Sequence, residues 1–282
     1  MLSQQQIDFY KENGYLGVEG VFSEEEMAEL RQVTDEFVEM SRAFTEHTAV
    51  FDLEPGHTQA EPRLRRLKSP IEHHDAYNRA IRQSNLLDIV EQLIGKGVHT
   101  NGNKLNMKSP GYGSPVEWHQ DWYFYPHTNQ DLLAVGIALD DMELENGPLM
   151  VIPGSHKGPI YSHHQDGVFV GAVTEEVPTA NTAVPITLKA GGISIHHARA
   201  LHASRTNVSD RPRRLLLFQY CAIDAWPLRG TSWEQYQANI VRGEPCQRPR
   251  MENVPVVIPL PEPEKVGSIY EIQTQLKNKV FA

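Results

Sequence analysis

The chain has 282 residues, of which 40% are hydrophobic and 22% are charged, as in an ordinary globular protein. This length accommodates one β-sandwich or barrel with helical additions. The formal net charge is −10 and the basic residues are spread thinly, which argues against nucleic-acid binding, because a phosphate backbone needs a clustered basic face.

The first residues, MLSQQQIDFYKENGY, lack the basic and apolar regions of a signal peptide. No apolar run approaches the roughly 18 residues that a membrane-spanning helix needs, so no span is expected. The two cysteines, Cys221 and Cys246, are expected to be free thiols in a reducing cytosol rather than a disulfide. We therefore expect a cytoplasmic protein, while its oligomeric state stays unknown.

The N-terminal part, residues 1–97, has the pattern of helices. Two Ser-x-x-Gln/Glu sequences, beginning at Ser3 and Ser23, fit the capping box that opens a helix. Apolar residues then recur at helical spacing after Ser23: Met27, Leu30, Val33, Phe37 and Met40. Residues 44–70 are expected to be irregular, and residues 72–96 to form a further helix.

The texture changes near residue 98, where short apolar runs such as LLAVGIALDD, PLMVIPG and RRLLLFQYCAI are separated by Gly, Pro, Asn and Asp. Such runs are typical of short antiparallel strands in a sandwich or barrel. We expect one domain over residues 1–282, mainly β with flanking helices. Its jelly-roll core would span 98–225, and a C-terminal closing segment would span 226–282, with helices near 231–242 and 266–279.

Histidine and aspartate occur two residues apart at three places: His73-His74-Asp75, His119-Gln120-Asp121 and His164-Gln165-Asp166. On a strand, such side chains share one face and can hold one metal ion. His73 begins an expected helix and His164 lies in an expected loop, whereas His119 lies in the strand-rich region before an aromatic run. We predict that His119 and Asp121 bind a metal; a structural histidine is the alternative.

A third ligand must come from another strand, and His196, His197 and His202 are the candidates, within GGISIHHARALHASRTN. After His202 come Ser204, a turn, and Arg213 on the next apolar strand. This order places a guanidinium near the metal, where it can hold the far carboxylate of a chelating co-substrate bidentately. Two histidines and one carboxylate form the ligand set of non-haem Fe(II) oxygenases.

These motifs resemble those of the phytanoyl-CoA dioxygenase family of Fe(II)/2-oxoglutarate-dependent oxygenases. The carrying sequences are WHQD at 118–121, LENGPLMVIPGSHKG at 144–158 and HASRTNVSDRPR at 202–213. The resemblance extends from the helical start IDFYKENGYLGVEGVFSEEE to the strand near Tyr220. It implies a double-stranded β-helix core, an Fe(II) cofactor, and 2-oxoglutarate and O2 as co-substrates.

The resemblance also implies residue roles. The iron ligands would be His119, Asp121 and His202. Arg213 would bind the far carboxylate of 2-oxoglutarate; Arg211 and Arg214 are close enough to compete, but the family spacing favours Arg213.

Further contacts are expected around these residues. Ser204 and the strand before the first motif could contact the co-substrate, the candidates on that strand being Lys104, Asn106 and Lys108. Many relatives carry Trp about where Gly136 lies, so extra room is expected there. The substrate pocket would be lined by Trp122, Tyr123, Tyr125 and His127, unless these rings only fill the barrel.

The expected reaction is hydroxylation or desaturation of a small organic substrate, with 2-oxoglutarate and O2 converted to succinate and CO2. Related halogenases lack the carboxylate of Asp121, so its presence argues against halogenation. Two alternatives stay open: a cupin-type metalloenzyme that does not use 2-oxoglutarate, and a non-catalytic small-molecule binding protein. Arg213 discriminates against the first, and the complete triad speaks against the second. The sequence does not identify the substrate.

Overall fold

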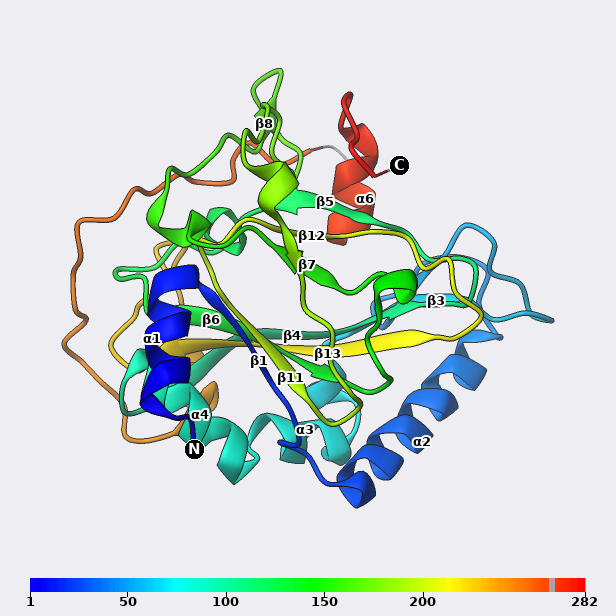
Figure 1. Cartoon of the computed structure of the whole chain (residues 1–282), viewed down its shortest axis with the longest axis horizontal. Helices are drawn as coiled ribbons and strands as arrows, with labels where there is room; N and C mark the ends of the chain where they lie inside the picture. The colour runs from blue at the N-terminus through cyan, green and yellow to red at the C-terminus, as the bar shows by residue number, and fades with distance from the viewer. Residues whose placement is uncertain (264–266, 282) are drawn as a thin grey trace.

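The structure is a computed structural model that describes residues 1–263 and 267–281. Two antiparallel sheets face each other, and the N-terminal helices pack along the larger one (Figure 1). The smaller sheet lies on the opposite side, close to the short C-terminal helix α6 (Figure 1). The prediction of a mainly β protein with flanking helices is confirmed.

The N-terminal helices are α1 (Gln4–Asn13), α2 (Glu24–Ser41), α3 (Asp75–Ile81) and α4 (Ser84–Ile94). Helices α1 and α2 begin at the two predicted capping boxes, at Ser3 and Ser23. The single helix expected over 72–96 is instead two helices. They are separate because the Gln83 side chain accepts a hydrogen bond from the backbone N–H of Leu86, at 2.7 Å, and so starts a new helix.

The larger sheet has the strand order β1-β11-β6-β13-β4-β3-β2, with β14 pairing the outer end of β4, among the residues that the structure describes. Its strands are β1 (Tyr15–Val18), β2 (Phe51–Leu53), β3 (Leu64–Lys68), β4 (Val98–Lys108), β6 (Leu132–Ala138), β11 (Ile193–His197), β13 (Arg213–Ala222) and β14 (Ile240–Arg242). Residues 44–70 are therefore not irregular throughout, since β2 and β3 lie within them and extend the sheet. Strands from both sides of residue 97, where the helical N-terminal part was expected to end, belong to this one sheet.

The smaller sheet has the order β10-β7-β12-β5 within the described residues. Its strands are β5 (Val116–His119), β7 (Leu149–Val151), β10 (Val184–Pro185) and β12 (His202–Ser204), and a separate hairpin is formed by β8 (His164–Gln165) and β9 (Val168–Phe169). Short 3-10 turns lie at Pro70–Glu72, Asp121–Tyr123, Leu144–Asn146, Ser155–Lys157, Ala180–Thr182 and Gln273–Gln275.

The main hydrophobic core lies between the helices and the outer face of the larger sheet. Alternation along β11 shows how the two faces differ: Ile193 and Ile195 belong to this core, whereas Ser194 and His196 point to the other face. That second face, directed toward the smaller sheet, carries the polar side chains of the candidate site.

The C-terminal segment differs from the prediction. Helix α5 (Trp233–Ala238) is followed by β14, so the helix expected over 231–242 is wrong at its C-terminal end, where residues 240–242 form a strand. The reason is that β3 pairs only the inner part of β4, which leaves the outer backbone groups of β4 available to β14. The helix expected over 266–279 is α6 (Ile269–Ile272) and one 3-10 turn; residue 266 lies outside the described residues.

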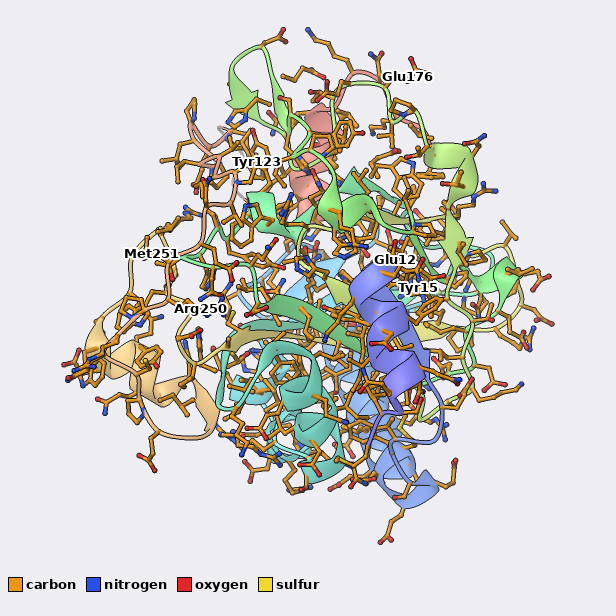
Figure 2. All side chains as sticks on the ribbon, turned by 60° about the vertical axis from the view of Figure 1, so that its left-hand side comes forward. Glu12, Tyr15, Tyr123, Glu176, Arg250 and Met251 are labelled. Atoms are coloured by element: carbon orange, nitrogen blue, oxygen red, sulfur yellow. The ribbon has the colours of Figure 1, made fainter. Side chains whose placement is uncertain are left out.

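Arg250 links the C-terminal segment to the sheet region through ion pairs. Arg250 forms ion pairs with Asp131, Asp224 and Glu252, and Figure 2 shows it on the side where the C-terminal segment passes. None of the described helices combines the length and the apolar character needed to cross a bilayer.

Candidate active site

The three predicted iron ligands lie together at the end of the smaller sheet. His119 is the last residue of β5 and is paired with His202 of β12. The two-residue spacing predicts Asp121 on the same strand as His119, but Asp121 instead begins a 3-10 turn. The turn still brings the carboxylate to the histidines, since Asp121 Oδ1 lies 3.9 Å from Nε2 of each imidazole. The three ligand atoms all lie within 4.8 Å of one another.

Backbone carbonyls orient both imidazoles. His119 Nδ1 lies 2.8 Å from the carbonyl oxygen of Glu117, and His202 Nδ1 lies 2.9 Å from that of Ala200. A carbonyl can only accept, so each Nδ1 carries the proton and each Nε2 presents a lone pair toward Asp121. Metal-binding histidines are commonly oriented in this way.

Burial sets the charge of these groups. It lowers the pKa of His119 to about 4, and burial with the neighbouring His119 and His196 holds the pKa of His202 well below its ordinary value. Burial opposes ionisation of Asp121, but the adjacent imidazoles and Lys104 outweigh it, so the pKa of this carboxyl lies well below its ordinary value. The site is thus two neutral imidazoles and a carboxylate, a donor set that fits Fe(II).

The other two His-x-Asp sequences do not form such groups in the described parts of the chain. His74 Nδ1 accepts the backbone N–H of Ala76 and caps α3. Asp166 lies at the turn of the β8–β9 hairpin, with a φ of 53°. His164 instead hydrogen-bonds the Tyr123 hydroxyl, at 2.7 Å.

Arg213 lines the same cavity as the triad. It is 2% exposed, and its Nε has no hydrogen-bond partner within the described structure. Burial lowers the pKa of its guanidinium to about 10. The two neighbouring arginines are directed elsewhere: Arg214 pairs with Asp140 at 2.7 Å, and the largely exposed Arg211 pairs with Glu143.

The cavity between the two sheets has a volume of about 50 Å³. Its polar lining comes from both sheets and from α6: Lys104, Asn106, His119, Asp121, His196, His202, Ser204, Arg213, Gln219 and Tyr270. The predicted co-substrate contacts Lys104, Asn106 and Ser204 are thus brought to the triad. Lys108 is not directed there; its ammonium donates to the Ser114 and Arg205 carbonyls.

The extra room expected at Gly136 is not present. A Cβ atom at this position would lie 2.7 Å from Ser194 Oγ and 2.8 Å from Leu215 Cδ1. Side chains on the two adjacent strands therefore fill the space that a larger residue would occupy.

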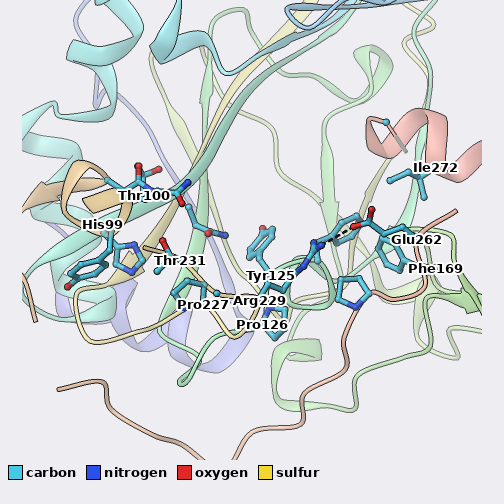
Figure 3. A pocket seen from close by; sticks show the side chains of 18 of the residues that line it. His99, Thr100, Tyr125, Pro126, Phe169, Pro227, Arg229, Thr231, Glu262 and Ile272 are labelled. Carbon is cyan, nitrogen blue, oxygen red and sulfur yellow. Dashed lines mark hydrogen bonds and ion pairs between the residues drawn. The ribbon is translucent and has the colours of Figure 1, made fainter. Parts of the chain in front are cut away.

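A second, larger cavity of about 620 Å³, called here the outer cavity, has a different lining (Figure 3). Tyr125 lines the outer cavity and Gln219 lines the inner one, and Gln219 Nε2 donates to the Tyr125 hydroxyl at 2.5 Å. This hydrogen bond lies between the two spaces. Of the four aromatic residues predicted to line the substrate pocket, Tyr125 alone lines either cavity among the described residues.

The other three lie elsewhere. Trp122 is fully buried and donates from Nε1 to the Pro255 carbonyl at 2.7 Å. The Tyr123 ring stacks on His163, with ring centroids 4.3 Å apart. Its hydroxyl faces the β8–β9 hairpin, near the C-terminal segment (Figure 2). His127 belongs to a different buried group.

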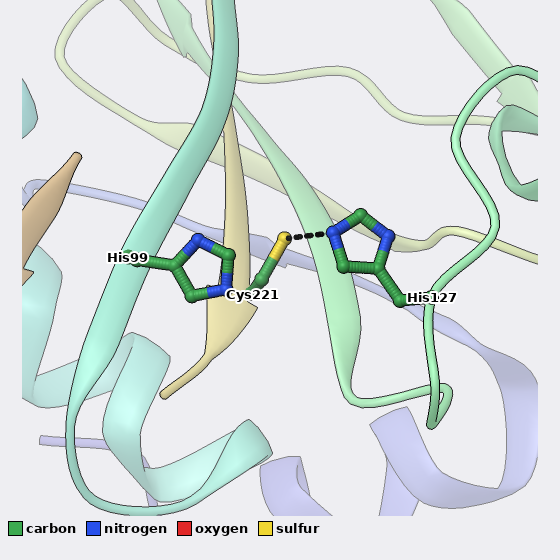
Figure 4. A group of neighbouring side chains, drawn as sticks. All are labelled: His99, His127 and Cys221. Carbon is green, nitrogen blue, oxygen red and sulfur yellow. Dashed lines mark hydrogen bonds between the residues drawn. The ribbon is translucent and has the colours of Figure 1, made fainter. Parts of the chain in front are cut away.

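That group is His99, His127 and Cys221, whose ligand atoms also lie within 4.8 Å of one another (Figure 4). Unlike the triad, these side chains use their ligand atoms in hydrogen bonds. His99 Nε2 faces the Ala225 carbonyl at 2.9 Å, and Cys221 Sγ lies 3.7 Å from His127 Nε2. Burial raises the pKa of the Cys221 thiol, which keeps it protonated. We interpret the group as a hydrogen-bonded part of the core.

Comparisons with known proteins agree with this geometry. The family model "Phytanoyl-CoA dioxygenase (PhyH)" matches residues 10–215. The chain belongs to this family. It is 33% identical, over the full length of both chains, to a probable alpha-ketoglutarate-dependent hypophosphite dioxygenase of Stutzerimonas stutzeri. It is 26% identical to the ectoine dioxygenase of Bordetella bronchiseptica, over 79% of this chain and 76% of the relative.

A solved structure supports the fold. The crystal structure of EctD from S. alaskensis with 2-oxoglutarate and 5-hydroxyectoine superposes with a TM-score of 0.67, at 21% identity, over 92% of this chain and 89% of that chain. The predicted jelly-roll core and the predicted enzyme class, an Fe(II)/2-oxoglutarate-dependent dioxygenase, are confirmed.

Some of the lining residues have no signal in the sequence. Gln219 and Tyr270 carry no motif, because strand register and the docking of α6 alone bring them to the cavity. From the sequence, His196 is only one of three candidates for the third metal ligand. Its Nε2 atom lies 3.4 Å from Asp121 Oδ2, and the residue is 2% exposed.

Proposed function

We propose that His119, Asp121 and His202 bind Fe(II) and that this enzyme hydroxylates a small substrate in the cavity beside them. The observation that supports this proposal is the combination, in one buried cavity, of an oriented two-histidine, one-carboxylate group with the guanidinium of Arg213, which has no partner among the described residues. The bound iron would activate O2 for substrate oxidation. The three residues would hold it, and iron bound by only three side chains could also bind small molecules.

We further propose that Arg213 and Ser204 bind the far carboxylate of 2-oxoglutarate and that Asn106 supports them. Arg66 Nε donates to Asn106 Oδ1 at 2.9 Å, so the amide is held in place at this end of the cavity. The Arg66 guanidinium lies over the Tyr270 ring, 5.2 Å from its centroid. These residues would anchor the co-substrate so that its 2-oxo acid end reaches the metal.

The protein would act as one cytoplasmic domain on a small molecule. The relatives named above act, by their names, on hypophosphite and ectoine. We take hypophosphite as the first substrate to test, since that relative matches this chain from end to end.

The test is succinate formation that requires added Fe(II), 2-oxoglutarate and substrate together. The His119→Ala protein should lose iron binding, measured by metal analysis after anaerobic loading and desalting, while circular dichroism shows an intact fold. Equal iron binding by the variant and the unsubstituted protein would contradict the ligand assignment. Turnover without 2-oxoglutarate would favour the cupin-type alternative.

A further inference from the structure

A cationic region of the inner cavity lies beside Asp121, toward the end away from Arg213. Along β13, alternate residues face the cavity, and Gln219 lies about 20 Å from Arg213 at roughly 3.4 Å per residue. Strand pairing places Lys104 and His196 nearer to the level of Gln219 than to that of Arg213. The residues at this end are therefore separate from those proposed to bind the far carboxylate of 2-oxoglutarate.

His196 has unused hydrogen-bonding capacity at this end. Its side chain is almost completely buried, and neither ring nitrogen has a hydrogen-bond partner among the described residues. Nε2 lies 3.4 Å from Asp121 Oδ2, on the side of the carboxylate away from the atom shared by the two histidine ligands. A buried polar group without a hydrogen-bond partner is unfavourable, so a ligand that pairs with His196 is favoured.

Lys104 supplies a positive charge near Asp121 that no described residue contacts directly. Its side chain lines the cavity, and its ammonium forms no hydrogen bond or ion pair within residues 1–263 and 267–281. Cations removed from water in proteins are normally paired. The register places the Lys104 backbone opposite Lys68 of β3, whose own ammonium is used by the Thr48 carbonyl, at 2.9 Å.

The balance of charge indicates the kind of ligand. The charged residues that line the cavity are Lys104, Arg213 and Asp121. With Fe(II) and the dianion 2-oxoglutarate bound, these groups leave one positive charge uncompensated. A monoanion would neutralise it, whereas a neutral or zwitterionic substrate would not.

We propose that Lys104 and His196 form the substrate subsite and that the substrate is a small oxoanion with an oxidisable P–H or C–H bond. This inference rests on the proposed function and assigns Lys104 to the substrate rather than to 2-oxoglutarate. Gln219 lines the cavity at this end and is hydrogen-bonded to Tyr125, so a larger substrate would have to extend past that hydrogen bond into the outer cavity.

For hypophosphite, the reaction breaks one P–H bond and forms one P–OH bond, giving phosphite. Phosphorus loses two electrons, 2-oxoglutarate loses two on conversion to succinate and CO2, and O2 accepts all four. One oxygen atom enters phosphite and the other enters succinate. Lys104 and His196 would hold the two substrate oxygens and so direct a P–H bond toward the metal.

The test uses the full chain loaded with Mn(II), a redox-inert substitute for Fe(II), and 2-oxoglutarate. Hypophosphite is titrated calorimetrically into the unsubstituted protein, Lys104→Met, His196→Phe and the matched control Lys68→Met. We expect Kd for hypophosphite to rise roughly 10- to 150-fold in the first two variants, as for loss of a hydrogen bond to a charged group. Kd for 2-oxoglutarate and for Mn(II) should stay within about twofold, and Lys68→Met should bind like the unsubstituted protein.

Several results would overturn the inference. Weaker 2-oxoglutarate binding by Lys104→Met, with unchanged hypophosphite binding, would show that Lys104 binds the co-substrate and not the substrate. Weaker Mn(II) binding by His196→Phe would make His196 a positioning residue for Asp121. If hypophosphite, phosphite and formate neither bind nor stimulate succinate formation while 2-oxoglutarate binds normally, the anion assignment fails and the proposed function stands. If 2-oxoglutarate does not bind, the proposed function itself fails.

Discussion

Replacement of Arg213 by Met tests the co-substrate site most directly. The guanidinium is 2% exposed, its Nε is unpaired in the described structure, and Met keeps most of the buried volume. In a complex with 2-oxoglutarate, the variant would leave the far carboxylate buried without its cation. Truncating one partner of such a pair costs about 2–5 kcal/mol, which corresponds to an increase in Kd of about 30-fold to a few thousand-fold.

The assay is anaerobic calorimetric titration of 2-oxoglutarate into Mn(II)-loaded protein. Arg213→Lys should lie between Arg213→Met and the unsubstituted protein, because it retains the charge but not the bidentate geometry. Arg211→Met is the matched control: this side chain is largely exposed and pairs with Glu143, so no change in Kd is expected. Binding by Arg213→Met within threefold of the unsubstituted protein would refute the assignment of the carboxylate to this residue.

Three further predictions concern stability, measured by urea unfolding. Gly136→Ala should destabilise the fold by about 1–3 kcal/mol, because its Cβ would lie within 2.8 Å of Ser194 and Leu215 side-chain atoms; an unchanged midpoint would show that these neighbours move freely. Leu86→Ala should cost about 2–5 kcal/mol, since Leu86 is fully buried under the larger sheet, and a loss under 1 kcal/mol would contradict that packing. Burial opposes ionisation of Asp52, but Arg65 at 2.6 Å outweighs burial and lowers the pKa of this carboxyl below its ordinary 3.8. The ion pair therefore stabilises the fold above about pH 4, and this stabilisation is lost as the pH falls further. The stability difference between the unsubstituted protein and Asp52→Asn should shrink in that range, and a difference independent of pH would argue against the pair.

Helix starts, strand regions and the residue types of the metal site could be predicted from the sequence, because they depend on neighbouring residues. The capping boxes at Ser3 and Ser23 open helices because their partners lie only three residues away. The short apolar runs and turn residues after residue 98 likewise mark the strands through local pattern, although the pairing of those strands is not local. The triad could be nominated because its residue types restrict the chemistry, and the ordered motifs restricted it further to one family.

Tertiary pairing decided what local pattern could not. Asp121 reaches the histidines from a 3-10 turn rather than a strand, and the expected room at Gly136 is filled by side chains of the adjacent strands. The last three residues of the helix expected over 231–242 form β14, because backbone groups of β4 that β3 does not pair were available there.

Of the residues at the inner cavity, His119 and Asp121 could be chosen from their residue types and position in the strand-rich region, whereas the family resemblance selected His202 over His196 and His197. Whether His196 faces the core or the cavity depends on strand register, since a shift of one residue would exchange the two faces. The sequence thus determined which chemistry the chain carries, and the pairing of distant strands determined which side chains stand beside it.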